Sequence, residues 1–164
     1  MRVLGIDPGL NVTGYGVLDG DDRQVRLVEA GVVRTDSSAP MADRLREIAA
    51  QMDQLIGQFR PDAVAVEDLY SHYAHPKTAI IMGHARGVVF LKAGEAGIEV
   101  HQYGATRVKK SLTGNGRATK RQMQLMIRST LGLNTIPEPD DAADALATAL
   151  CHCRTLGSRE AVLP

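Results

Sequence analysis

Four carboxylates occupy positions from which they could act together. Asp7 ends the apolar run RVLGID, and the Pro8-Gly9 pair behind it is typical of a tight turn. Glu67 ends a second apolar run, AVAVE. Asp141 and Asp144 lie three residues apart in an Ala/Leu-rich segment, so on a helix they would project from nearly the same face. Two strand ends and one helix face therefore supply four oxygen donors.

The chemistry that suits such a set is divalent-metal chemistry. If the two strands are neighbours, both acids emerge at one sheet edge, and a helix laid on the sheet adds the other two. The cluster would repel itself unless cations neutralised it, and oxygen ligands without His or Cys suit Mg²⁺ or Mn²⁺ better than zinc. Two ions about 3.5–4 Å apart can activate water and stabilise the leaving oxygen of a phosphodiester.

Each acid also has a plainer interpretation. Asp7 could cap the Pro-Gly turn, Glu67 could pair with an arginine, and Asp141 with Asp144 could complement the positive end of a helix. The set of four, beside a basic segment, favours the metal site.

The charges of the chain are segregated although 19 basic and 19 acidic residues give a net charge of zero. Residues 1–68 carry −5, residues 69–137 carry +8 and residues 138–164 carry −3. Residues 100–137 contain no acid but seven cations: Arg107, Lys109, Lys110, Arg117, Lys120, Arg121 and Arg128. This block indicates a polyanionic partner, with a solvated helix face as the alternative.

The hydrophobic pattern predicts an α/β domain that begins with three antiparallel strands and then alternates helix and strand. The glycine-rich loop at 113–119 is expected to be mobile and to become ordered on a polyanionic partner. A Thr119–Gln122 capping box opens the fourth expected helix, at 119–131. Strands are expected at 2–7, 12–20, 25–35, 63–67 and 98–103, and helices at 41–59, 75–97, 105–112, 119–131 and 140–153.

Length and composition predict one domain over residues 1–156, followed by a disordered tail at 157–164. No long apolar stretch and no secretory leader are apparent, and Cys151 and Cys153 point to different sides of a helix and cannot pair. A cytoplasmic location is therefore expected. Zinc at Cys151, His152 and Cys153 is disfavoured because no second ligand pair has suitable spacing.

Five segments, in order and spacing, resemble the RuvC family of Holliday-junction resolvases: GIDPGLNVTGYGV, VEDLY, GHARGV, RVKKSLTGNGRATKRQM and DAADALATAL. The resemblance implies an α/β, ribonuclease-H-like fold. In this fold a five-stranded mixed sheet, whose first three strands are antiparallel, has helices on both faces. It implies a crossover junction endodeoxyribonuclease of recombination and DNA repair, which nicks two opposed strands of a four-way junction symmetrically and leaves 5′-phosphate and 3′-hydroxyl ends.

The resemblance also implies roles for particular residues. The family's metal-binding acids fall on Asp7, Glu67, Asp141 and Asp144, which would hold two Mg²⁺ per subunit, with Mn²⁺ able to substitute. Lys120 would contact phosphate and stabilise charge near the scissile group. Tyr70 would stack on a DNA base, and Tyr73 is a weaker candidate for the same role. The remaining implied contacts are with the DNA backbone, from Lys109, Lys110, Arg117 and Arg121. Asp140 departs from the family pattern and has no assigned role.

A homodimer is expected, because symmetric cutting of two strands suits two sites related by a two-fold axis. We expect the interface on the helix of residues 79–92, whose apolar residues Ile80, Ile81, Met82, Val88, Val89 and Leu91 cover more than one face. Burial within one subunit is the competing account. The branch-migration proteins RuvA and RuvB are further partners that the resemblance implies.

Three other functions are weighed against this one. A sugar-kinase or actin-type ATPase would need a second such domain and a phosphate loop that this chain lacks. A RuvC-like ribosomal-RNA nuclease is disfavoured by the VEDLY and DAADALA segments. A junction-binding module without catalysis is disfavoured because all four acids are present.

Overall fold

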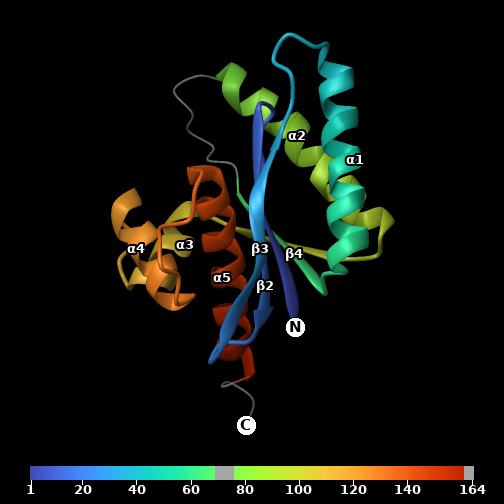
Figure 1. Ribbon diagram of the computed structural model, residues 1–164. Helices are drawn as coiled ribbons and strands as arrows, with labels where there is room; N and C mark the ends of the chain where they lie inside the picture. Colours follow the sequence, from blue (N-terminus) through green and yellow to red (C-terminus); the bar gives the residue numbers. More distant parts are fainter. Residues whose placement is uncertain (69–75, 161–164) are drawn as a thin grey trace.

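Five strands form one mixed sheet in the computed structural model, which describes residues 1–68 and 76–160 (Figure 1). The sheet order is β3-β2-β1-β4-β5. β1 pairs antiparallel with β2, and β2 with β3, whereas β4 is parallel to β1 and β5 to β4. The predicted mixed sheet with an antiparallel start is therefore confirmed. The strands are β1 (Arg2–Asp7), β2 (Val12–Gly20), β3 (Val25–Arg34), β4 (Ala63–Glu67) and β5 (Glu99–Tyr103).

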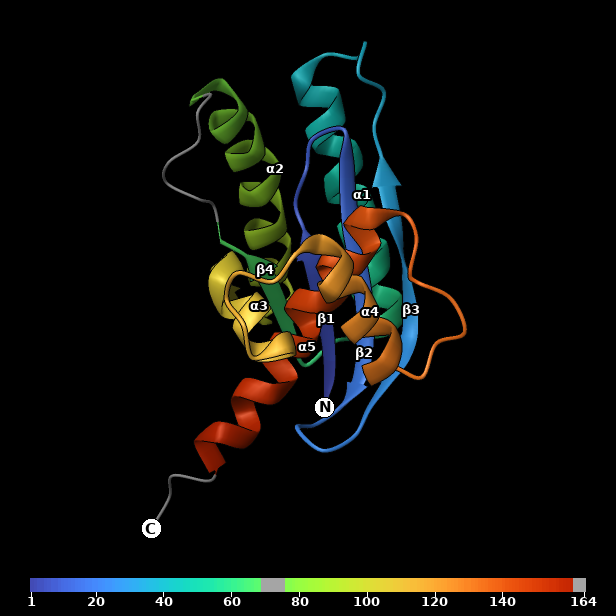
Figure 2. The ribbon, with the colours of Figure 1, turned by 90° about the vertical axis from the view of Figure 1, so that its left-hand side faces the viewer.

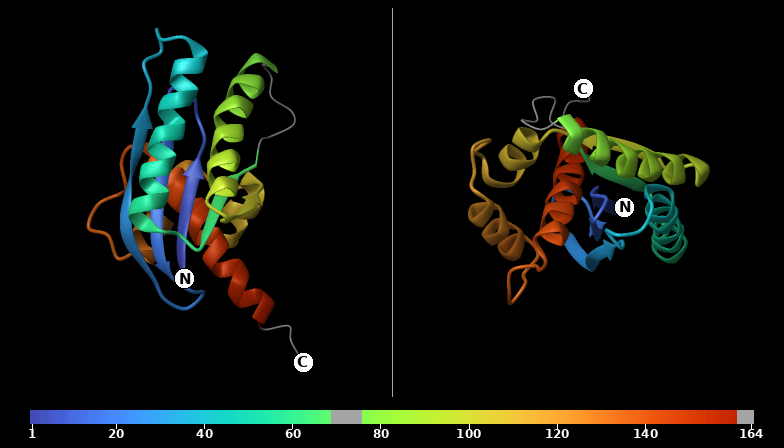
Figure 3. Two further views of the ribbon diagram at one scale, coloured as in Figure 1. Left: turned by 90° about the vertical axis from the view of Figure 1, so that its right-hand side faces the viewer. Right: turned by 90° about the horizontal axis from the view of Figure 1, so that it is seen from above.

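Helices cover both faces of the sheet, as expected. One face is covered by α1 (Met41–Phe59) and α2 (Pro76–Glu95), and the other by α5 (Asp140–Glu160) (Figures 1 and 3). Figure 2 shows α3 (Ala105–Thr113) and α4 (Lys120–Thr130) lying outside α5. None of the described helices is both long and apolar enough to cross a membrane.

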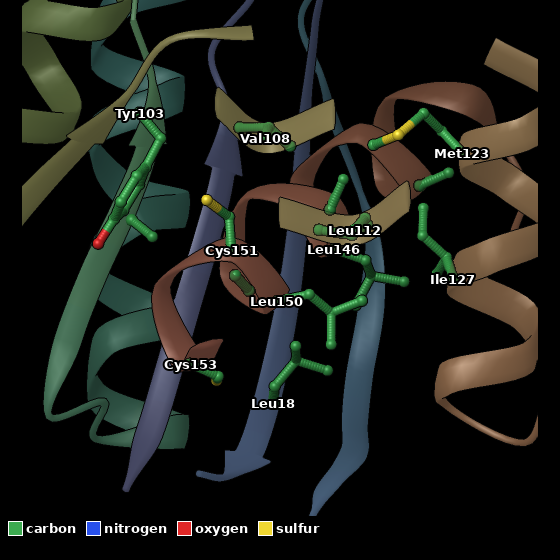
Figure 4. Close-up of a cluster of buried hydrophobic side chains, with 14 of the residues drawn as sticks. Leu18, Tyr103, Val108, Leu112, Met123, Ile127, Leu146, Leu150, Cys151 and Cys153 are labelled. Carbon is green, nitrogen blue, oxygen red and sulfur yellow. The ribbon is translucent and has the colours of Figure 1, made fainter. Parts of the chain in front are cut away.

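The helix that carries two of the four acids is buried on nearly all sides through its middle turns. The sheet packs against one side of α5, and α3 with α4 packs against the other (Figure 4). A helix in such a position needs apolar residues all round, which explains the Ala/Leu-rich sequence of α5. Cys151 and Cys153 are consequently both buried in this core, and both are free.

Glycines on β1 and β2 allow α5 to lie unusually close to the sheet. A Cβ atom on Gly5 would stand 2.2 Å from the carbonyl oxygen of Ala145, and one on Gly14 would stand 1.9 Å from that of Asp141. Any larger residue at either position would push the helix away. The glycines in the opening motif therefore set the height of α5 above the strand ends.

The expected end of the last helix is wrong. The pattern predicted a helix over 140–153 with a tail from 157, but α5 continues to Glu160. Arg154 anchors the extension, because its Nη1 donates to the carbonyl oxygens of Ser111 at 2.6 Å and Leu112 at 3.2 Å. The remaining tail residues, 161–164, lie outside the described residues.

The predicted capping box of α4 is confirmed. The Thr119 hydroxyl accepts from the backbone N–H of Gln122, and the Gln122 side chain accepts from the Thr119 N–H at 2.8 Å. The loop before it carries local hydrogen bonds, with the side chain of Asn115 accepting from the N–H of Arg117 at 2.9 Å. Ala118 is buried at the end of this loop.

Candidate functional site

The fold brings the two strand-end acids to one edge of the sheet. β1 and β4 are parallel neighbours in which Ile6 pairs with Val66, so Asp7 and Glu67 are the next residues along. The antiparallel partner of Asp7 on β2 is Gly14, and the backbone of Asp141 lies directly over Gly14. The start of α5 is thereby placed above the end of β1.

The pKa of Asp7 reflects this convergence. Burial raises it most, and the carboxylates of Asp144, Glu67 and Asp141 raise it further, to about 7. The ammonium group of Lys120 acts in the opposite direction. Asp7 therefore lies within electrostatic range of the other three predicted acids.

Two other acids of the set are perturbed in the same direction. Burial and the nearby charge of Asp144 raise the pKa of Glu67, while Lys109 partly offsets the effect. Burial also raises the pKa of Asp144, against the opposing charge and hydrogen bond of Lys120. Perturbation by burial together with named charged partners is typical of functional carboxylates.

Lys120, the first residue of α4, contacts two acids at the start of α5. Its Nζ lies 3.3 Å from Oδ2 of Asp144 and 3.0 Å from Oδ2 of Asp140. Burial lowers its pKa, but the hydrogen bond to Asp140 and the charge of Asp144 outweigh burial and raise the pKa overall. Lys120 is therefore cationic at neutral pH and stands beside a predicted metal ligand.

Asp140 acquires a structural role that the sequence did not reveal. Besides Lys120, it accepts a hydrogen bond from Nε2 of Gln124 at 2.9 Å. It thus joins the first turns of α4 and α5. The position in the sequence gave no sign of this contact, because Lys120 and Asp140 are twenty residues apart and meet only through helix packing.

A pocket of about 240 Å³ opens beside the acids. Glu67, Asp144, Lys109 and Lys120 give it two negative and two positive groups. Its remaining walls are apolar and were not predicted as part of the site: Ala105, Val108, Met123 and Ala147. Of these, Ala147 could have been found from sequence, because it lies three residues after Asp144 on the same face of α5.

The donor set fits a hard divalent cation in its chemistry. All four acids offer oxygen only, and their mutual repulsion, seen in the raised pKa values, is what a bound cation would relieve. As the side chains stand within residues 1–68 and 76–160, no three His, Cys, Asp or Glu are arranged so that they could hold a metal ion. Asp144 is instead engaged by Lys120.

The other predicted DNA contacts are dispersed. Lys110, Arg117 and Arg121 are exposed, and none of them lines the acid pocket. Lys110 lines a different pocket, formed by α3 and α5. Tyr70 and Tyr73, the predicted stacking residues, lie outside the described residues.

The strand order, the flanking helices and the acids at the sheet edge define a ribonuclease-H-like protein. The structure superposes on that of T. thermophilus RuvC in complex with Holliday junction substrate with a TM-score of 0.92 and 39% sequence identity, over 97% of this chain and 96% of that one.

Sequence comparison gives the same assignment. The family pattern of crossover junction endodeoxyribonuclease RuvC matches residues 3–152. RuvC of Rhodopirellula baltica is 50% identical over 91% of this chain and 84% of its own length, and RuvC of Chloroflexus aggregans is 46% identical over 94% of each. The chain belongs to the RuvC family of crossover junction endodeoxyribonucleases.

Proposed function

We propose that this protein resolves Holliday junctions by metal-dependent hydrolysis of one phosphodiester in each of two opposed strands. The observation that carries the proposal is the convergence of Asp7, Glu67, Asp141 and Asp144 beside Lys120, in a chain of the RuvC family. The similar T. thermophilus RuvC is described in complex with a Holliday junction substrate, which supports the choice of DNA over RNA.

The four acids would hold the metal ions, two Mg²⁺ per subunit, with Mn²⁺ able to substitute. When bound, the ions supply an activated water and stabilise the charge of the leaving oxygen. Divalent cations would also compensate for the burial and repulsion that raise the pKa of Asp7. Asp7 would then remain ionised at neutral pH.

The lysines in the pocket would act on the DNA backbone. Lys120 lies on the α4 side of the acids and can donate to a non-bridging oxygen of the scissile phosphate, where negative charge develops. Lys109 lines the same pocket beside Glu67 and would hold a phosphate oxygen of the same strand. The products would carry 5′-phosphate and 3′-hydroxyl ends. Stacking by Tyr70 or Tyr73 remains a prediction from the family resemblance.

We further propose that the enzyme acts as a homodimer through α2. Ile80 and Leu91 are eleven residues apart, so they lie on one stripe of the helix, and they are 62% and 58% exposed. For Val89 the competing account holds, because Val89 is fully buried with Ala85 and Ala93 in the core beneath α2. RuvA and RuvB are expected as further partners from the family resemblance. The expected location is the cytoplasm, where the two free cysteines would stay reduced.

Cleavage of matched substrates tests the proposal. A mobile four-way junction, a linear duplex of the same sequence and an RNA duplex are incubated with Mg²⁺, Mn²⁺ or EDTA. Paired nicks at symmetric positions, confined to the junction and dependent on metal, are expected. Ligation of the nicks without end repair would confirm the end chemistry. Tight junction binding without nicks in either metal would show a binding module instead.

A further inference from the structure

A second pocket lies on the other side of α3 from the acid site, where α3 faces the last turns of α5. Its volume is about 360 Å³, and it is lined by Arg107, Lys110, Ser111, Arg154 and Thr155. The acid pocket is lined by Ala105, Val108 and Lys109 of α3. This pocket is lined by Arg107, Lys110 and Ser111 of the same helix, which lie on its other side. We call it the α3–α5 basic pocket.

The charges of the α3–α5 basic pocket are not balanced by the carboxylates whose side chains the structure describes. Its lining contains three cationic side chains and no carboxylate. Within the described part of the chain, Arg107 and Lys110 form no ion pair. They are three residues apart on one helix, a spacing at which like charges destabilise each other. A bound anion would relieve this repulsion.

Two of the three cations are held in place before any ligand arrives. The guanidinium of Arg107 lies 5.1 Å from the ring centre of Tyr103, and its Nη2 is 3.5 Å from Oγ1 of Thr155. The guanidinium of Arg154 is fixed by the carbonyl oxygens of Ser111 and Leu112 at the end of α3. Side chains that are already ordered lose less conformational entropy on binding, which favours a true binding site.

We propose that the α3–α5 basic pocket binds a backbone phosphate of the junction DNA at a distance from the cleavage site. The proposal rests on the function proposed above. Guanidinium groups match phosphate geometry, and Lys109 on the same helix already points to the acid pocket, so one strand can follow α3 from one pocket to the other.

The position of the pocket predicts which phosphate it takes. Asp144 and Thr155 are eleven residues apart on α5, which corresponds to about 16 Å along the helix. Consecutive phosphates of one strand rise by about 3.4 Å along a DNA duplex. Because the strand also winds around the duplex axis, two of its phosphates that lie about 16 Å apart in a straight line are about two to three nucleotides apart. The bound phosphate is therefore about two to three nucleotides from the scissile one, within the same junction arm.

The test combines protein variants with DNA in which single phosphates are replaced by neutral methylphosphonates. Junction affinity is measured at several salt concentrations for the wild type, Lys110→Gln and Arg107→Gln, with Arg46→Gln on the opposite side of the sheet as the matched control. Lys110→Gln is included because Arg107 also packs on the buried Tyr103, so that its loss could disturb the fold.

We expect Lys110→Gln to weaken junction binding about 3- to 10-fold and to lower the salt slope by about one, whereas Arg46→Gln changes neither. A methylphosphonate about two to three nucleotides from the cleavage site should weaken wild-type binding equally, and should have no further effect on Lys110→Gln. Additive losses, or equal salt slopes in Lys110→Gln and Arg46→Gln, would overturn the proposal. Cleavage of unmodified junction by the wild type tests the resolvase function separately.

Discussion

At the scale of single residues, Asp7 must be ionised to hold a metal ion, but its ionisation lowers the stability of the metal-free fold. Its pKa is raised from 3.8 to about 7 by burial and by three neighbouring carboxylates, so the folded protein binds a proton that the unfolded chain releases between pH 4 and 7. The free energy of unfolding therefore falls as the pH rises through this range, and is unaffected by Asp7 below it.

Because ionised Asp7 destabilises the metal-free fold, we expect Asp7→Asn to stabilise the metal-free protein at pH 8. Each pKa unit corresponds to about 1.4 kcal/mol, so the gain is at most about 4 kcal/mol and should shrink toward zero near pH 4. Thermal unfolding in EDTA at several pH values measures it. If the variant is less stable than the wild type at pH 8, Asp7 is not the repelled carboxylate that the geometry indicates.

Asp140 is predicted to be a positioning residue for Lys120. If Asp144 becomes a metal ligand, Asp140 remains as the carboxylate that holds the Lys120 ammonium, at 3.0 Å. We expect Asp140→Asn to slow nicking about tenfold, as loss of an orienting partner does at metal sites. Glu138→Gln, two residues earlier, is the control.

A double-mutant cycle separates this role from a general effect on the helix. Lys120→Ala should slow nicking on the order of 100-fold, and adding Asp140→Asn should have little further effect, because both changes remove one interaction. Losses that multiply in the double variant would mean that Asp140 acts independently of Lys120.

At the scale of elements, the site depends on how closely α5 approaches the sheet. Gly14→Ala places a Cβ atom against the carbonyl oxygen of Asp141, so we expect a loss of about 1–3 kcal/mol and slower nicking. Gly57→Ala, in an exposed position of α1 with no atom near the added Cβ, should instead stabilise by up to about 1 kcal/mol. Denaturant unfolding of both variants checks the pair, and equal effects would contradict the close-approach argument.

The same elements show what sequence patterns can predict. Apolar periodicity, turn residues and the capping box are local signals, and they placed every helix and strand to within about two residues except at the end of α5. Convergence of the acids followed from strand ends meeting at one edge. The Asp140–Lys120 contact, the Met123 wall of the pocket and the burial of Val89 depend on how helices pack, which one sequence does not encode locally.

At the scale of the whole molecule, symmetric cutting of two opposed strands requires two active sites in one particle. We expect the 17.6 kDa chain to sediment as a dimer, and Leu91→Glu to shift it to a monomer because a charge would be buried at the α2 interface. Leu125→Glu, a comparable change at an exposed position of α4, should leave the dimer intact. A wild-type monomer, or a dimer unaffected by Leu91→Glu, would contradict this interface.

Junction cleavage and junction binding by Asp7→Asn, measured on the same synthetic junction in Mg²⁺, test the central claim most directly. We expect the wild type to make paired symmetric nicks. We expect the variant to bind the junction with similar affinity but to make no nicks, because one of the metal-binding carboxylates is lost. Undiminished nicking by Asp7→Asn would contradict the claim that the four converging acids form the catalytic site.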